Sequence, residues 1–419
     1  MKLTKESQLL MSFFHKNNCV NTIDNNAQTN IIFANLYEDI HEAHEFVSQQ
    51  SQQSISKHLK HITNIGQITK PATFPESGFP EKILSHINTH TISEIHYEIN
   101  MFNKTYNVYF LITNVSSTTD KKLQVYDNYV TEILVWITIL NKYAPQNCRN
   151  NGLSLYLYFT NLKKELPNNA SIMLDEHHIN TAFTYSCPNI PEIVVFRKEE
   201  WFKVFIHETF HNFGLDFSMM NMTKSNKFVR SIFNVVKSDI NLFEAYTEFW
   251  AKIINICFCS YKTMHNKTDL DEYLDLAETF VNVERTHLYF QAIKVLDFMS
   301  LNYSMLTSDD TNISNSTKDK YKEDTSVLSY YIICLVLFND YQRFLKWCLT
   351  NNSNSNLFLF KRTPQNLTKF CKYIKDNYKM HEFLHNISCT EEILRRMKAK
   401  PSKYSFYLTN LRMTLCELG

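Results

Sequence analysis

The segment Arg197–Phe213, with the sequence RKEEWFKVFIHETFHNF, carries the pattern from which the fold of this 419-residue chain is best inferred. Its apolar residues recur at the spacing of an amphipathic helix, namely Trp201, Phe202, Val204, Phe205, Phe210 and Phe213. His207 and His211 stand four residues apart, so they share one face of the predicted helix. Gly214 follows and can adopt the left-handed conformation with which helices commonly end.

Strand-like segments precede this helix. Alternating apolar residues over 94–101 and 106–113 predict a β-hairpin that turns at Asn103 and Lys104. A long amphipathic helix is expected next, and then three more strands. These later elements cover residues 122–143 for the helix and residues 153–160, 180–185 and 192–196 for the strands. Strands followed by a mainly helical remainder predict an α+β fold.

The chain is expected to divide into an N-terminal segment and two lobes. Residues 1–80 are polar, rich in Gln and Asn, and punctuated by three prolines towards their end, which predicts an accessory N-terminal segment and linker. Residues 81–215 are expected to form a lobe that contains the sheet and the histidine-bearing helix. Residues 216–419 read mainly as helix and predict a second lobe, interrupted by a polar stretch over 307–326 that is expected to be a mobile loop.

Composition excludes several classes of protein. Lys and Arg number 43 and Asp and Glu number 42, so no overall charge favours nucleic acid or an anionic membrane as a partner. The longest largely apolar run, Val327–Phe338, is too short to cross a bilayer. No secretory signal is recognisable, and the ten cysteines contain no CxxC pair, which predicts reduced thiols in a cytoplasmic protein.

The pentad His207–His211, HETFH, has the spacing of a zinc site. Two imidazoles on one helical face can bind a single ion, while Glu208 points towards the open position of that ion. Because the chain has 16 histidines, chance alone should produce an HExxH on the order of a few times per hundred such chains. The alternative interpretation is therefore two histidines on a solvated face that happen to bracket a glutamate.

The chain also contains a second HExxH at His381–His385. We interpret it as a coincidence, because a lysine precedes it, no strand leads into it and no glycine follows. Glu417 is nevertheless a conceivable third ligand there. A further set of histidines has spacings that resemble metal sites but lies on polar segments, where solvated side chains are the simpler interpretation. This set is His41, His44, His86, His90 and His96.

A catalytic zinc takes three protein ligands and keeps one position open. A third histidine six residues after His211 would complete one common pattern, but that position is Phe217. Further on, Glu244 and Glu248 lie one turn apart on a predicted helix, in the sequence NLFEAYTEFWA. They could be an ordinary solvated stripe. Combined with the histidine pair, they indicate that one glutamate binds the metal while its neighbour orients an imidazole through the nitrogen that the metal does not use.

The combination of HETFH with the downstream EAYTE resembles the gluzincin metallopeptidases, and EAYTEFWA is similar to the ligand helix of the lethal-factor-like group. The segment over 180–218 also resembles a set of zinc metallopeptidases encoded by large DNA viruses. This resemblance implies a zincin-like α+β fold, in which a mixed β-sheet and the active-site helix form an upper lobe and helices form the lower lobe. It also implies a location in the host cytoplasm or the virion.

Carried over by position, the resemblance implies one Zn²⁺ per chain, bound by His207, His211 and Glu244. Glu208 would act as the general base and Glu248, where many gluzincins have Asp, would support a ligand. The expected reaction is hydrolysis of peptide bonds in a peptide or protein substrate by a metal-activated water. The alternative is a non-catalytic structural or virion-associated protein on the same scaffold. Candidates for stabilising the oxyanion are Tyr185, Tyr246 and Tyr404. Arg412 could bind a substrate carboxylate, and an edge strand, EIVVF at 192–196 or NTAFT at 180–184, could hold an extended substrate.

Overall fold

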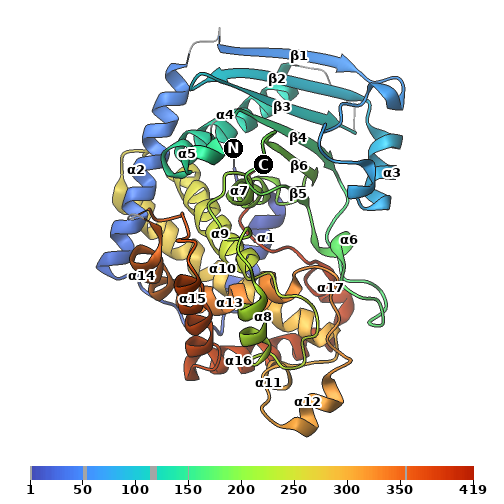
Figure 1. Cartoon of the computed structure of the whole chain (residues 1–419), viewed down its shortest axis with the longest axis vertical. Coiled ribbons are helices and arrows are strands. Elements are labelled where there is room, and N and C mark those ends of the chain that lie inside the picture. The colour runs from blue at the N-terminus through green and yellow to red at the C-terminus, as the bar shows by residue number, and fades with distance from the viewer. Residues whose placement is uncertain (1, 51–53, 114–119, 150, 354–355) are drawn as a thin grey trace. The chain divides into compact units, whose positions relative to one another are not determined.

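The computed structural model describes residues 2–50, 54–113, 120–149, 151–353 and 356–419 (Figure 1). The chain forms two compact units. The first comprises Ala34–Lys163 and Thr181–Leu215, and the second comprises Lys2–Phe33, Lys164–Asn180 and Asp216–Gly419. This division differs from the predicted one, because the first 80 residues do not form a segment of their own but contribute to both units.

A mixed six-stranded sheet, in the order β1-β2-β3-β4-β6-β5, forms the first unit with its helices (Figure 1). The strands are β1 Ile55–His61, β2 Ser93–Met101, β3 Lys104–Ile112, β4 Leu153–Thr160, β5 Ala182–Thr184 and β6 Glu192–Arg197. Strands β3, β4 and β6 are mutually parallel, whereas the other pairings are antiparallel. The central strands β4 and β6 are buried almost throughout, as expected for parallel strands covered on both faces. The predicted α+β class is confirmed.

The β2–β3 hairpin turns one residue earlier than predicted. Its two central residues are Phe102 and Asn103, with φ of 55° and 56°. Positive φ at both positions defines the type I′ turn, whose twist matches that of the flanking strands. Asn is common in such turns, but Phe is not, so the sequence pattern placed the turn too late.

Helices cover both faces of this sheet. They are α3 Glu81–His90, α4 Asp120–Tyr143, α5 Gln146–Arg149 and α7 Trp201–Asn212, together with the part of α2 Ala27–Gln49 that follows Phe33. On one face, Ile83 and Ile87 of α3 pack in a cluster with Tyr158 and Phe196 of the strands. On the other face, Phe110 of β3 contacts α4 at a ring distance of 4.9 Å from Tyr126.

The predicted linker before residue 81 is an integral part of this unit. Strand β1 pairs along its whole length with β2. The buried carboxylate of Glu192 accepts hydrogen bonds from the backbone of Ala72 and Thr73, each at 2.8 Å. The sequence did not predict β1 because its residues, ISKHLKH, lie on an exposed sheet edge and show no alternation of apolar and polar side chains.

Within the described residues, the second unit consists mainly of helices. Its longest helices are α9 Leu242–Thr263 and α10 Leu270–Phe298, which pack against each other and are buried over most of their length. The others are α1 Lys5–Lys16, α6 Glu176–Ile179, α8 Thr223–Arg230, α11 Tyr303–Leu306, α12 Thr311–Thr317, the π-helix Leu328–Ile333, α13 Cys334–Asn339, α14 Tyr341–Asn351, α15 Pro364–Asn377, α16 His381–Lys398 and α17 Pro401–Thr409. Helix α12 lies within the stretch predicted to be a loop.

Two disulfides contradict the expectation that every cysteine is a reduced thiol. They join Cys19 to Cys389 and Cys148 to Cys187. The partners are 370 and 39 residues apart in the sequence, so the spacing of cysteines along the chain could not reveal either pair. In the described part of the chain, every helix is either too short or too polar to be a membrane-spanning segment.

Candidate metal centre

The two histidines of HETFH face each other on α7. His207 and His211 are both buried, and their Nε2 atoms are 3.2 Å apart. Two nitrogens that each bind a tetrahedral zinc at 2.0–2.1 Å lie about 3.3–3.4 Å apart. The observed separation therefore fits two imidazoles that share one ion.

Several backbone contacts hold the end of α7 that carries His211. Gly214 has a φ of 63°, as predicted for the residue that ends the helix. Its amide donates to the carbonyl of His211 at 3.0 Å, and the amide of Leu215 donates to Phe210 at 2.8 Å. These two bonds form a Schellman motif. The amide of Cys187, after β5, also donates to the His211 carbonyl at 3.2 Å, so the turn that carries His211 is tied to the edge of the sheet.

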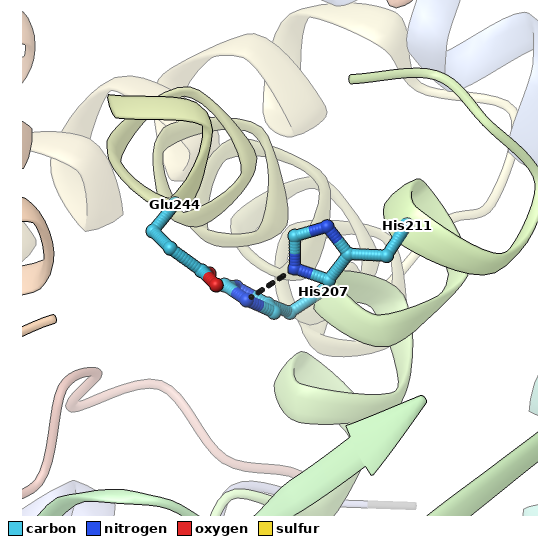
Figure 2. A group of neighbouring side chains, drawn as sticks. All are labelled: His207, His211 and Glu244. Carbon is cyan, nitrogen blue, oxygen red and sulfur yellow. Dashed lines mark hydrogen bonds between the residues drawn. The ribbon is translucent and has the colours of Figure 1, made fainter. Parts of the chain in front are cut away.

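A carboxylate completes the group. Glu244 lies in the first turn of α9 and is partly buried. One potential ligand atom from each of Glu244, His207 and His211 lies within 4.8 Å of the other two, and Figure 2 shows the three side chains pointing towards one another. The group could therefore hold a metal ion. Two imidazole nitrogens and one carboxylate oxygen are donors that suit zinc.

The other histidine groups considered in the sequence do not come together with further potential ligands in the described residues. Among the described residues, no other set of three or more potential ligands comes close enough to hold an ion. His381 and His385 of the second HExxH are exposed on α16. Glu417, the conceivable third ligand for that motif, instead pairs with Arg412 at 2.8 Å. His86 and His90 stack on each other at a ring distance of 4.2 Å without further ligands.

The two other glutamates predicted for this site are buried. Glu208, predicted as the general base, lies on α7 directly after His207 and is 7% exposed. Glu248 lies one turn after Glu244 on α9 and is 1% exposed, so the interpretation of a solvated stripe is wrong for this residue. The carboxylate of Glu248 lies 3.1 Å from Nζ of Lys252, which is 0% exposed. Lys252 was not among the predicted site residues, although its i,i+4 spacing from Glu248 is typical of a helical ion pair.

Two of the candidate substrate contacts are wrong. Tyr246 is fully buried, and its hydroxyl donates to the carbonyl of Phe358 at 2.8 Å. Burial also raises its pKa well above the ordinary value for tyrosine. Arg412 is 0% exposed and pairs with Glu6 and Glu417. Neither side chain is available to a substrate.

The two remaining tyrosines differ in their surroundings. Tyr185 follows β5 and is half exposed, and its ring stacks on Phe74 at 4.4 Å. Tyr404 lies on α17 and contacts Phe13 of α1. Neither position by itself assigns a role in binding a substrate.

No protein-family model, curated protein or solved structure matches this chain. The evidence for its class therefore comes from its own residues. That evidence is a group of two histidines and a glutamate that could hold a metal ion, with a buried glutamate beside the first histidine.

Proposed function

We propose that this protein is a zinc-dependent metallopeptidase of the gluzincin type. The observation that carries the proposal is the convergence of His207, His211 and Glu244 to within 4.8 Å, with Glu208 adjacent to the first histidine. A purely structural zinc site is normally closed by four protein ligands, whereas a catalytic site keeps one position open. The three ligands found here favour the catalytic type.

Different residues of the chain would have different roles in hydrolysis. His207, His211 and Glu244 would hold the ion. Zinc, when bound, supplies a Lewis acid that makes a nearby water acidic and polarises the scissile carbonyl. Glu208 would accept the proton of the attacking water and deliver it to the leaving amine, which is the usual task of a general base that later acts as an acid. Glu248 would keep a ligand correctly oriented.

The sheet supports a zincin-like architecture and a site for an extended substrate. Strand β5 is the last strand in the order and runs antiparallel to β6, so one of its edges is unpaired within the described sheet. Asn212, the last residue of α7, donates to Oγ1 of Thr184 in β5 at 2.9 Å. A peptide that added to this edge as a further strand would therefore run beside the helix that carries the zinc ligands.

Zinc analysis and peptide cleavage test this proposal. Wild-type protein should contain one zinc per chain and cleave an unstructured protein such as casein. Glu208→Gln should keep the zinc and lose at least about 100-fold in rate, the lower end for a general base. Glu244→Ala should lose the zinc. Wild-type protein without stoichiometric zinc would contradict the proposal, and so would cleavage by Glu208→Gln at the wild-type rate. Wild-type protein that binds zinc but cleaves nothing would favour the non-catalytic alternative.

A further inference from the structure

A buried lysine contacts two carboxylates, one of which lies one turn after Glu244 of the candidate metal centre. Nζ of Lys252 on α9 is 3.1 Å from Oε1 of Glu248 and 3.6 Å from Oε1 of Glu284 on α10. The exposed fractions of the three side chains are 0%, 1% and 0%. All three charges are therefore removed from solvent.

Two residues near the end of the chain, Thr414 and Leu415, bind the carboxylate of Glu284. Oε2 of Glu284 accepts a hydrogen bond from Oγ1 of Thr414 at 2.9 Å and another from the backbone amide of Leu415 at 3.1 Å. Both donors are fully buried, as is the neighbouring Arg412. Because Oε2 is engaged by two fixed donors, the other oxygen of Glu284 has a defined position next to Lys252.

Stability alone does not account for such a group. Removing charges from water is costly, and well-packed apolar residues in the place of a buried ion pair are often equally stable or more stable. What the buried ion pair contributes instead is a fixed geometry of its side chains. Glu244 and Glu248 lie one turn apart on α9 and therefore share a helical face. The lysine thus fixes the carboxylate next to the one that belongs to the metal-binding group.

We propose that Lys252 is a positioning residue of the metal centre. It holds Glu248 in place one turn after the ligand Glu244, and Glu284 with Thr414 and Leu415 holds Lys252. This inference rests on the zinc site of the proposed function. It extends the site from the three ligands to a buried network that ends in the C-terminal residues.

The first test compares two buried lysines. Lys294 on α10 is also buried, and its Nζ donates to the backbone carbonyls of Tyr407 and Asn410 rather than to a carboxylate. Zinc affinity is measured by competition with a chromophoric chelator, and unfolding of the zinc-free proteins is measured in parallel. Lys252→Met should bind zinc about 10–100-fold more weakly, the usual effect of losing a residue that supports a metal ligand. Lys294→Met should be destabilised but bind zinc within about twofold of wild type.

A double variant tests whether Lys252 acts through Glu248. Glu248→Gln alone should weaken zinc binding, and adding Lys252→Met to it should cause little further loss, because the two residues then act as one unit. After cobalt replaces zinc, the visible spectra of Glu248→Gln, Lys252→Met and the double variant should all differ from that of wild type in the same way. If Lys252→Met does not fold, Glu284→Gln keeps the shape of the group and should give a smaller loss of affinity in the same direction.

The outcomes separate this inference from the proposed function. If wild-type protein binds no zinc, both proposals fall. If wild type binds zinc and Lys252→Met, or Glu284→Gln in its place, matches Lys294→Met in zinc affinity, the positioning role is overturned while the metal centre stands. Additive losses from Glu248→Gln and Lys252→Met would also overturn it.

Discussion

Gly214 offers a direct test of how α7 ends. Its φ of 63° is in the left-handed region, and its amide closes the Schellman motif on the carbonyl of His211. For a residue with a Cβ atom, the left-handed conformation costs roughly 1–2 kcal/mol. Alanine also restricts the unfolded chain and recovers about 0.4–1 kcal/mol where its conformation is allowed. We therefore expect Gly214→Ala to lower the free energy of unfolding by about 1 kcal/mol.

The chain provides a matched control for this substitution. Gly78 is exposed, has no positive φ, and a Cβ atom there would meet no atom within 4 Å. Gly78→Ala should change the free energy of unfolding by no more than about 0.5 kcal/mol. Gly214→Asn should be less harmful than Gly214→Ala, because asparagine adopts the left-handed conformation more readily.

Urea unfolding of the zinc-free proteins, followed by circular dichroism, measures these differences. For a domain of 150–250 residues, a loss of 1 kcal/mol also lowers Tm by about 2–4 °C. Equal stability of the alanine variants at 214 and 78 would show that the left-handed conformation of Gly214 is not needed. A larger loss for asparagine than for alanine at 214 would refute the steric explanation.

Two further predictions concern histidines outside the candidate centre. The double variant His381→Ala/His385→Ala should keep the zinc content of wild type, because the second HExxH is exposed and no third ligand approaches it among the described residues. Loss of one equivalent of zinc would contradict this. Burial, together with repulsion from His90, lowers the pKa of His86 below its ordinary value of 6.5. The unfolded state then gains protons first as pH falls below about 6.5, so stability should decrease there. His86→Gln should weaken this decrease between pH 7.5 and 5.5 in urea unfolding, and an unchanged dependence would refute it.

Local periodicity predicted most of the first unit. Strand β4 and helix α4 were placed almost to the residue, because each has a long and regular apolar pattern. Strand β1 was missed, because an exposed edge strand needs no apolar face. The four disulfide-bonded cysteines were missed for a different reason. Their pairing depends on which distant segments meet, and a single sequence does not contain that information.

In the candidate site, too, contacts between residues close in the sequence were predictable from periodicity, whereas contacts between distant residues were not. His207 and His211 are one helical turn apart, so their shared face follows from the sequence alone. Glu244 is 33 residues further on, and only the chemical requirement for a third ligand suggested it. The contact between Lys252 and Glu284 joins two helices, and the anchoring of Glu284 by Thr414 depends on the path of the last residues. Such contacts follow from packing, which no periodicity in the sequence encodes.

Two residues other than glycine next to the ends of α7 have strained, left-handed backbone conformations. Glu200, just before the helix, has a φ of 60°, and Cys187, which bonds to the carbonyl of His211, has a φ of 46°. Left-handed conformations at residues other than glycine cost about 1–3 kcal/mol and persist only where the surroundings enforce them. Here the surroundings include the disulfide to Cys148 and the complete burial of α7. A helix whose two ends are fixed in this way holds His207 and His211 in one arrangement. If these two histidines bind an ion, as we propose, metal binding need not supply the free energy to order them.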